Sequence, residues 1–184
     1  WELFRNKENP FLNISLSLLI PFYTTLPFAF LSNMAYLDKQ FEPGIVIGII
    51  LLSWANDTFA YLIGRTFGKN KLFERISPKK TIEGSLAGLV STILIAYFIL
   101  PNIFTVQGIT AIDWLIIGIL VVVFGSLGDL VESMFKRSVN IKDSGKLLPG
   151  HGGFLDRFDA LLLAVPFIYS YLYIVRHLVN NIGV

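Results

Sequence analysis

Three aspartates mark the ends of two apolar segments. Asp156 and Asp159 stand three residues apart at the start of one segment, and Asp129 lies near the end of another. On a helix, the i, i+3 spacing places the first two carboxylates on one face of the first turn. The helix macrodipole explains one acidic residue there more readily than two. Mg²⁺ prefers oxygen ligands and usually keeps waters or substrate phosphates in its shell. The three aspartates therefore indicate a hard-cation site.

A fourth carboxylate, Asp57, lies inside another apolar segment. It forms a stripe with Ser53, Tyr61 and Arg65, because residues four apart share one face of a helix. For Ser53 and Tyr61, a polar contact between helices explains the pattern as well as a ligand role does. An ionisable group at such depth is costly and usually faces a site, so we expect a functional role for Asp57.

A glycine-rich turn with one histidine, residues 148–154, precedes the aspartate pair. Its backbone can approach a phosphate closely, and His151 could transfer a proton, although a lone loop histidine more often only forms hydrogen bonds. The string that starts at Gly64 is one residue short of a P-loop, and no Ser-His-Asp or HExxH pattern is present. Carboxylates, a metal and basic residues together suit phosphoryl or nucleotidyl transfer.

Composition places this chemistry in a membrane. Of the 184 residues, 54% are hydrophobic and only 15% are charged, against about 25% in soluble domains. The mean hydropathy is +0.65. The net charge of +2 does not suggest a nucleic-acid partner, and the lack of cysteine excludes disulfides and thiolate metal sites. One substrate of the predicted phosphotransfer is therefore expected to be a lipid.

The apolar segments predict an all-α, polytopic membrane helix bundle with about five transmembrane helices. A bilayer core needs about 20 apolar helical residues. The segments that qualify or nearly qualify are 11–35, 44–64, 85–112, 114–131 and 158–175. Pro21 and Pro27 should kink the first of them, and no strand is expected. We expect residues 1–184 to form a single membrane-embedded catalytic domain that lacks further N-terminal spans.

Basic residues alternate between the connections. Almost all of the 15 Lys and Arg lie in the N-terminal arm, in residues 65–84 or in residues 136–157. By the positive-inside rule, these three segments face the cytoplasm and the C-terminus faces outward. Attraction to anionic lipid is an alternative explanation for the basic residues. It does not explain why the same loops also contain clustered glycine, histidine and aspartate residues.

Two stretches resemble one enzyme family. Residues 133–159, SMFKRSVNIKDSGKLLPGHGGFLDRFD, resemble the motif of phosphatidate cytidylyltransferases (CDP-diacylglycerol synthases), and we find no departure from it. A second stretch, DTFAYLIGRTFGK at 57–69 followed by SPKKTIEGS at 77–85, is also similar to the family. The likeness runs from about residue 50 to 165. Family members usually have further spans before the region where this chain begins.

The resemblance implies a reaction and a set of site residues. CTP and phosphatidic acid would give CDP-diacylglycerol and pyrophosphate, with Mg²⁺ required and a second cation left open. Asp129, Asp156 and Asp159 would ligate the metal and, with Lys142, act in catalysis. The expected substrate-binding residues are Asp57, Ser77, Lys79, Lys80, Thr81, Lys136, Arg137, His151, Gly152, Gly153 and Arg157.

The resemblance also implies partners and a location. We expect an integral protein of the bacterial inner membrane with its site at the cytoplasmic face, binding CTP, phosphatidic acid and membrane lipid, with a homodimer left open. Two alternatives remain. A CTP-dependent lipid kinase of the polyprenol or phytol type would use similar groups but transfer the γ-phosphate. A cation transporter would use Asp57 and Asp129, but would not need the glycine-rich turn.

Overall fold

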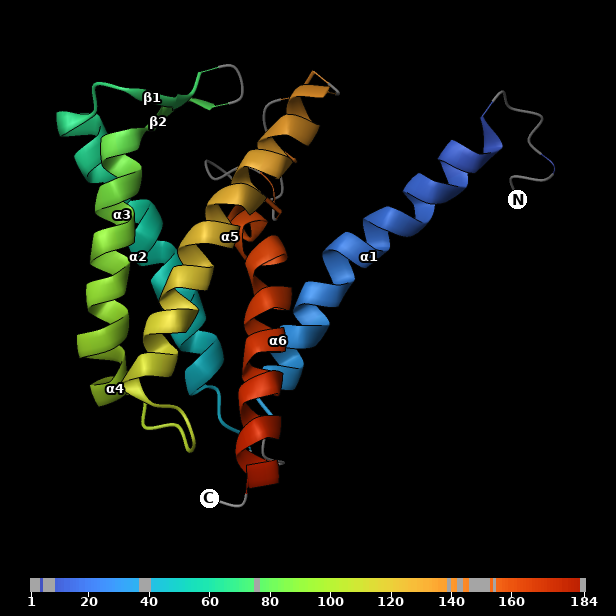
Figure 1. Cartoon of the computed structure of the whole chain (residues 1–184). Helices are drawn as coiled ribbons and strands as arrows, with labels where there is room; N and C mark the ends of the chain where they lie inside the picture. Colours follow the sequence, from blue (N-terminus) through green and yellow to red (C-terminus); the bar gives the residue numbers. More distant parts are fainter. Residues whose placement is uncertain are drawn as a thin grey trace.

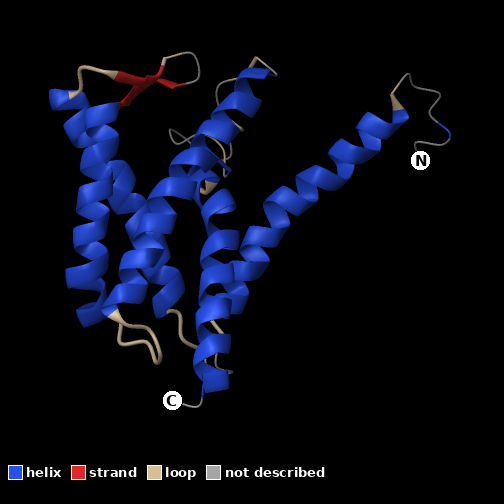
Figure 2. Ribbon diagram, viewed as in Figure 1, coloured by secondary structure: helices blue, strands red, loops and turns tan. Residues whose placement is uncertain are grey.

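The chain folds into a helical bundle with one small hairpin (Figures 1 and 2). The computed structural model describes residues 4, 9–36, 41–74, 77–138, 140–141, 144–145, 153 and 155–182, with backbone only from 176. The α-helices are α1 (Pro10–Met34), α2 (Gly44–Phe67), α3 (Ile82–Leu94), α4 (Leu100–Ile103), α5 (Ala111–Ser138) and α6 (Asp159–Ile182). A π-helical turn, η2 (Ile95–Ile99), joins α3 to α4, and a 3₁₀ turn, η3 (Leu155–Arg157), precedes α6. The strands are β1 (Lys71–Phe73) and β2 (Ser77–Thr81).

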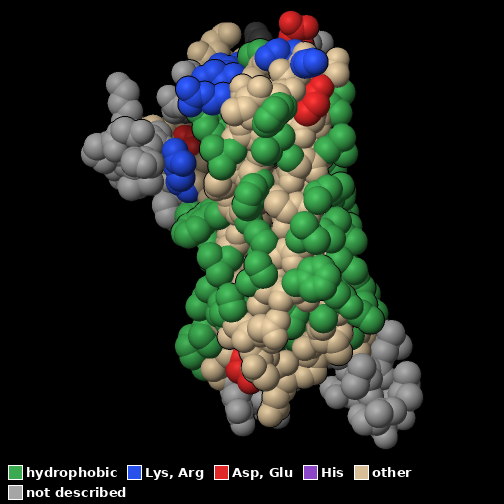
Figure 3. All heavy atoms as spheres, turned by 90° about the vertical axis from the view of Figure 1, so that its left-hand side faces the viewer, with side chains coloured by type: hydrophobic (Ala, Val, Ile, Leu, Met, Phe, Trp, Pro, Cys, Tyr) green, Lys and Arg blue, Asp and Glu red, His purple; other side chains and the backbone are tan. Residues whose placement is uncertain are grey.

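The described helices are those of an integral membrane protein. Four helical stretches are long and apolar enough to cross a bilayer, namely α1, α2, Ile82–Ile103 and α5, and α6 adds a shorter apolar part, Asp159–Val175. Hydrophobic side chains cover the middle of the face shown in Figure 3, where lipid tails rather than water would surround them. This confirms the prediction of an all-α polytopic bundle with about five helices. The first helix is continuous through Pro21 and Pro27.

Two predicted details were wrong. The third span ends at Ile103 and not at Ile112, because the backbone becomes extended at Phe104 (φ −114°, ψ 98°) and continues into a loop with Gly108 at φ +70°. Just before Pro101, the Leu100 amide donates to the Ile95 carbonyl, which produces the π-helical turn. The expectation of no strand was also wrong, since β1 and β2 pair as an antiparallel hairpin.

The hairpin, the C-terminal end of α5 and the N-terminal end of α1 lie at one end of the bundle (Figure 1). Lys and Arg side chains gather at the same end in the space-filling view (Figure 3), and we call it the basic end. The opposite end holds α4, the start of α5 and the C-terminus. The structure thus places the basic connections on one side, as predicted, while their orientation in a membrane stays a prediction.

Glycines allow α2 and α3 to touch along their backbones. A Cβ on Gly84 would lie 2.5 Å from the Ala60 carbonyl oxygen, and one on Gly88 would lie 2.6 Å from Asn56 Oδ1. Small residues at such positions are typical of close helix pairs in membranes. Thr81 caps α3, because its hydroxyl accepts the Gly84 amide at 3.2 Å. This contact fixes the end of β2 against the helix pair.

Glu83 ties the other side of the hairpin to α3. Its carboxylate accepts the amides of Lys69, at 3.1 Å, and of Asn70, at 3.2 Å. It also accepts the Asn70 side-chain amide at 2.8 Å. The hairpin is therefore held at both ends, and this places β2 above the site described below.

Two contacts set the register of α5 against α6. Near the basic end, a Cβ on Gly128 would lie 2.6 Å from the Asp159 carbonyl oxygen, so the start of α6 lies directly on α5. Near the opposite end, the buried Asp113 accepts the Tyr171 hydroxyl at 2.7 Å and the Thr110 amide at 2.7 Å. Both helices face a core whose fully buried members include Trp114 and Ile168.

Candidate active site

One face of α5 carries a row of polar side chains. Asp129, Glu132, Ser133 and Lys136 follow at helical spacing, and Asp129 Oδ1 accepts the Ser133 hydroxyl at 3.2 Å. Lys136 Nζ donates to Glu132 Oε2 at 3.0 Å. Apolar side chains cover most of the rest of this helix, so the row is an isolated polar strip within the bundle.

Lys80 joins the hairpin to this strip. Its amine forms an ion pair with Asp129 Oδ2, and the two side chains are 30% and 27% exposed. Asp57 of α2 interacts electrostatically with both groups. Three elements that are distant in sequence thus bring together one amine and two carboxylates, all of which the sequence analysis singled out.

Asp156 organises the segment that leads into α6. Its Oδ1 accepts Lys136 Nζ at 2.7 Å, and its Oδ2 accepts the Gly153 amide at 2.7 Å and the Ser144 amide at 2.9 Å. The Ser144 hydroxyl adds a further bond at 3.0 Å. Burial alone would raise the pKa of the Asp156 carboxyl, but these hydrogen bonds hold its pKa well below the usual range. The carboxylate is therefore ionised and serves as an anchor for this segment.

Asp159 stands in the first turn of α6, where its Oδ1 accepts the Ala160 amide at 2.6 Å. It interacts electrostatically with Asp129 and Glu132. The close contact at Gly128 produces this proximity, because it leaves no side chain between the two helices. The predicted approach of Asp129 to the start of the last span is thus present in the structure.

Two buried polar atoms in this region have no hydrogen-bond partner among the described residues. Glu132 is only 7% exposed, and its Oε1 is one of these atoms. The other is the hydroxyl of Tyr23, from α1, which interacts electrostatically with Glu132 and Asp159. The sequence analysis proposed neither residue for the site. Glu132 lies on the same helical face as Asp129, a signal that could have found it, whereas nothing in the sequence indicates Tyr23.

The donor chemistry suits a hard cation. Within the described residues, no three His, Cys, Asp or Glu side chains are close enough together to hold one ion. Mg²⁺ is often bound by only one or two carboxylates plus substrate phosphates, so the Asp129 and Asp159 oxygens fit it. Asp156 differs, because its oxygens accept hydrogen bonds from Lys136, Ser144 and Gly153, which hold the segment before α6, whereas the exposed Lys80 amine on Asp129 can be displaced. The three-aspartate metal site stays a prediction.

A model of the cytidylyltransferase family matches residues 1–175. The chain belongs to this family. Similar relatives are the phosphatidate cytidylyltransferases of Staphylococcus saprophyticus (44% identical, over 72% of this chain and 51% of the relative) and Haemophilus influenzae (39% identical, over 90% and 58%). That of Bacillus subtilis is 40% identical over 80% of this chain and 54% of its own. The chain spans about half the length of these curated relatives. The family resemblance seen in the sequence is confirmed.

The remaining predicted site residues of this cytidylyltransferase chain fall into four groups. Ser77 and Lys79 lie on β2 near Lys80, and the hydroxyl of Thr81 serves as the cap of α3. Arg137 and Arg157 are exposed, and Arg137 donates to the Ile141 carbonyl at 3.5 Å. Gly153 is a backbone donor to Asp156. Lys142, His151 and Gly152 lie outside the described residues.

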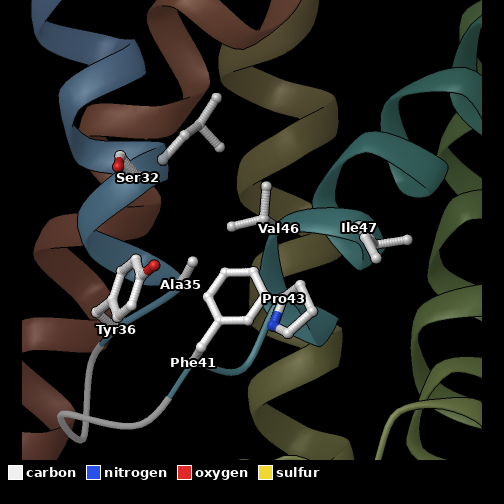
Figure 4. Close-up of a pocket in the computed structure, with 8 residues that line it drawn as sticks. Ser32, Ala35, Tyr36, Phe41, Pro43, Val46 and Ile47 are labelled. Atoms are coloured by element: carbon white, nitrogen blue, oxygen red, sulfur yellow. The ribbon is translucent and has the colours of Figure 1, made fainter.

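A cavity of about 340 Å³ lies far from these groups, between the C-terminal end of α1 and the start of α2 (Figure 4). Its lining is mostly apolar, with Ser32 and Tyr36 as the polar members. The described residues that line it offer no carboxylate or amine for phosphate chemistry. The candidate active site of this family member is therefore the charged group at the basic end and not this cavity.

Proposed function

We propose that this chain is a Mg²⁺-dependent phosphatidate cytidylyltransferase. In this reaction an oxygen of the phosphatidic acid phosphate bonds to the α-phosphorus of CTP, and the bond from that phosphorus to the β-phosphate oxygen breaks. The products are CDP-diacylglycerol and pyrophosphate. The observation that carries the proposal is the convergence of Asp57, Lys80, Asp129 and Asp159 at the basic end of an apolar bundle, in a chain of the cytidylyltransferase family.

The charge balance of the site favours a metal-assisted mechanism. A chain of contacts and electrostatic interactions links Asp57, Asp129, Glu132, Asp156 and Asp159 to two lysine amines among the described residues. Such an excess of carboxylate would repel a triphosphate. We propose that Asp129 and Asp159, together with substrate phosphates, hold Mg²⁺, and that the buried Glu132 faces this ion. The metal, when bound, would neutralise charge on the phosphate oxygens.

The two lysines take different parts in this proposal. Lys80 lies on the hairpin, and its side chain is 30% exposed, so its amine can turn from Asp129 toward a substrate phosphate. Lys136 is 16% exposed and bonds two carboxylates, so it holds the Asp156 anchor in place. Lys142, His151 and Gly152 remain proposed contacts of the nucleotide phosphates, on the strength of the family motif.

The basic end is proposed to face the cytoplasm of a bacterium, at the inner membrane, because loops rich in Lys and Arg stay on that side. CTP would reach the site from water, while phosphatidic acid would reach it from the bilayer. Single cysteines at positions 71 and 140, both described at the basic end, should react with an impermeant reagent only from the cytoplasmic side. Labelling from the outside would show that the basic end faces away from the cytoplasm.

The family resemblance also leaves a homodimer open, which crosslinking in vesicles would detect.

The activity is tested with the chain reconstituted in vesicles that contain phosphatidic acid. CTP and Mg²⁺ should give equal amounts of pyrophosphate and CDP-lipid, and omission of phosphatidic acid or chelation of the metal should stop both. Formation of CDP and a lipid monophosphate from a polyprenol would instead support the kinase alternative. Release of no pyrophosphate in the presence of phosphatidic acid would refute the proposed function.

A further inference from the structure

Tyr23 lies on α1 near the charged site, in a part of the helix where most neighbouring side chains are exposed. Its neighbours Ile20 and Phe22 are 60% and 69% exposed, as expected for side chains that face lipid. The Tyr23 ring instead turns inward and contacts Phe135 of α5 edge-on, with ring centroids 6.3 Å apart. This contact places the ring against α5 and leaves the hydroxyl buried.

The hydroxyl of Tyr23 is buried and has no hydrogen-bond partner among the described residues. Buried polar atoms are rarely left unpaired in native proteins. The group interacts electrostatically with Glu132 and Asp159, the residues proposed above to face the metal. Glu132 Oε1, on a side chain that is 9% exposed, also receives no hydrogen bond from a described donor, and its carboxylate lies within hydrogen-bonding reach of the Asp159 carboxylate. The Tyr23 hydroxyl on α1 and Glu132 Oε1 on α5 therefore lie close enough to interact electrostatically, and neither has a described hydrogen-bond donor or acceptor. This arrangement points to a ligand that contacts both atoms.

The chemistry of the two atoms narrows the ligand. A phenol at neutral pH donates one hydrogen bond, whereas a carboxylate only accepts or binds a cation. A phosphate oxygen paired with a cation satisfies both at once. We propose that the Tyr23 hydroxyl donates a hydrogen bond to a phosphate oxygen of the lipid substrate, and this inference rests on the cytidylyl transfer proposed above.

Assignment to the lipid follows from the character of α1. The helix has no charged residue between Pro10 and Met34, and its exposed face is apolar. It also diverges from the bundle toward its N-terminal end (Figure 1). A lipid that approaches through the bilayer therefore meets α1, while the nucleotide meets the lysines and loops of the basic end. A neutral donor on α1 can hold a lipid phosphate without adding a charge to the bilayer-facing side.

Tyr23→Phe tests the proposal, because it removes the hydroxyl and keeps the ring that contacts Phe135. In vesicles of graded phosphatidic acid content, we expect the KM for phosphatidic acid to rise about tenfold, as for one hydrogen bond to a charged group. The KM for CTP should not change. Tyr36→Phe is the matched control, since Tyr36 follows the C-terminal end of α1, away from the basic end, and is 55% exposed. It should leave both constants unchanged.

A binding measurement separates this inference from the proposed function. Short-chain phosphatidic acid, without CTP, should raise the thermal unfolding temperature of the wild-type chain and of Tyr36→Phe, but raise that of Tyr23→Phe far less. This result would support the Tyr23 contact even if the wild type formed no CDP-lipid, which would refute only the proposed reaction. Equal stabilisation of all three chains would overturn the inference. A rise in the KM for CTP alone, or a loss of stability with both KM values unchanged, would overturn it as well.

Discussion

Replacement of Lys80 by alanine should selectively weaken the handling of substrate. In the structure the Lys80 amine pairs with Asp129, and Asp57 lies within electrostatic reach of both. Without the amine, two carboxylates remain with no described positive partner at this corner of the site. A phosphate would lose a donor there and also meet stronger repulsion, so both effects act in the same direction.

The size of the effect follows from the exposure of the pair. At 30% and 27% exposure the ion pair itself is screened, and such pairs contribute only about 0–1 kcal/mol to folding. The chain should therefore fold without Lys80. A hydrogen bond from the amine to a charged phosphate contributes about 1.5–3 kcal/mol. Its loss would lower kcat/KM by roughly ten- to a hundredfold.

The assay is formation of CDP-lipid in vesicles, with kcat/KM measured for CTP and for phosphatidic acid. Lys71→Ala is the matched control, because Lys71 lies on the other strand of the same hairpin and is exposed. It should retain the wild-type rate. Asp129→Asn alone and with Lys80→Ala completes a double-mutant cycle, in which contacting residues show a coupling of about 0.5–3 kcal/mol.

Three outcomes would refute the reasoning. Equal, small effects of Lys80→Ala and Lys71→Ala would make Lys80 an ordinary surface charge. Additive losses in the cycle would mean that Lys80 and Asp129 act independently, contrary to their ion pair. A large loss of thermal stability in Lys80→Ala would assign the residue to folding instead of substrate.

Further predictions concern the carboxylates. Asp159→Asn should lower the rate of CDP-lipid formation about a hundredfold and weaken its Mg²⁺ dependence, while the exposed Glu74→Gln should do neither. Asp113→Asn should lower thermal stability by about 1–3 kcal/mol with its KM values unchanged, because it weakens the bond to Tyr171. Since the pKa of Asp156 is lowered in the folded chain, its contribution to stability should be complete above pH about 4 and decline as the pH falls. Acid unfolding of Asp156→Asn should lack that decline.

The membrane helices could be predicted from the sequence because each carries a long apolar signal. The same signal misplaced the end of the third span. Residues 104–110 are a loop, yet Phe104, Val106 and Ile109 pack on the core, and Val106 is only 7% exposed. Hydropathy reports burial and lipid contact alike, so an apolar loop beneath a bundle resembles the end of a helix.

The hairpin could not be predicted because its cause is not local. Strands of three and five residues are too short for a periodic pattern. They are held by the Glu83 carboxylate, which accepts the amides of Lys69 and Asn70, fourteen and thirteen residues earlier. The sequence indicated Lys80 as a phosphate contact, but its position above Asp129 depends on this tertiary clamp.

The aspartates were found because their spacing is a property of single helices, whereas their partners depend on packing. Lys136 and Asp156 are twenty residues apart, and Tyr23 reaches the site through a contact of α1 with α5. The spacing of residues along a single helix predicts neither contact. Sequence patterns thus identified the acids and bases, and only the assembled bundle showed which of them share a neighbourhood.

The two lysine pairs differ in a way that separates the parts of the site. Lys136 is held by two carboxylates at 2.7 and 3.0 Å and is 16% exposed, so its release would leave buried charges unpaired. Lys80 has one carboxylate partner and nearly twice that exposure. Exchange of the Asp129 carboxylate for a phosphate oxygen at Lys80 therefore costs little free energy. The same exchange at Lys136 would remove its bond to Asp156, which holds the segment before α6. In the proposed reaction, which brings two phosphate-bearing substrates to the site, Lys80 of the hairpin would be the movable cation and Lys136 the fixed one.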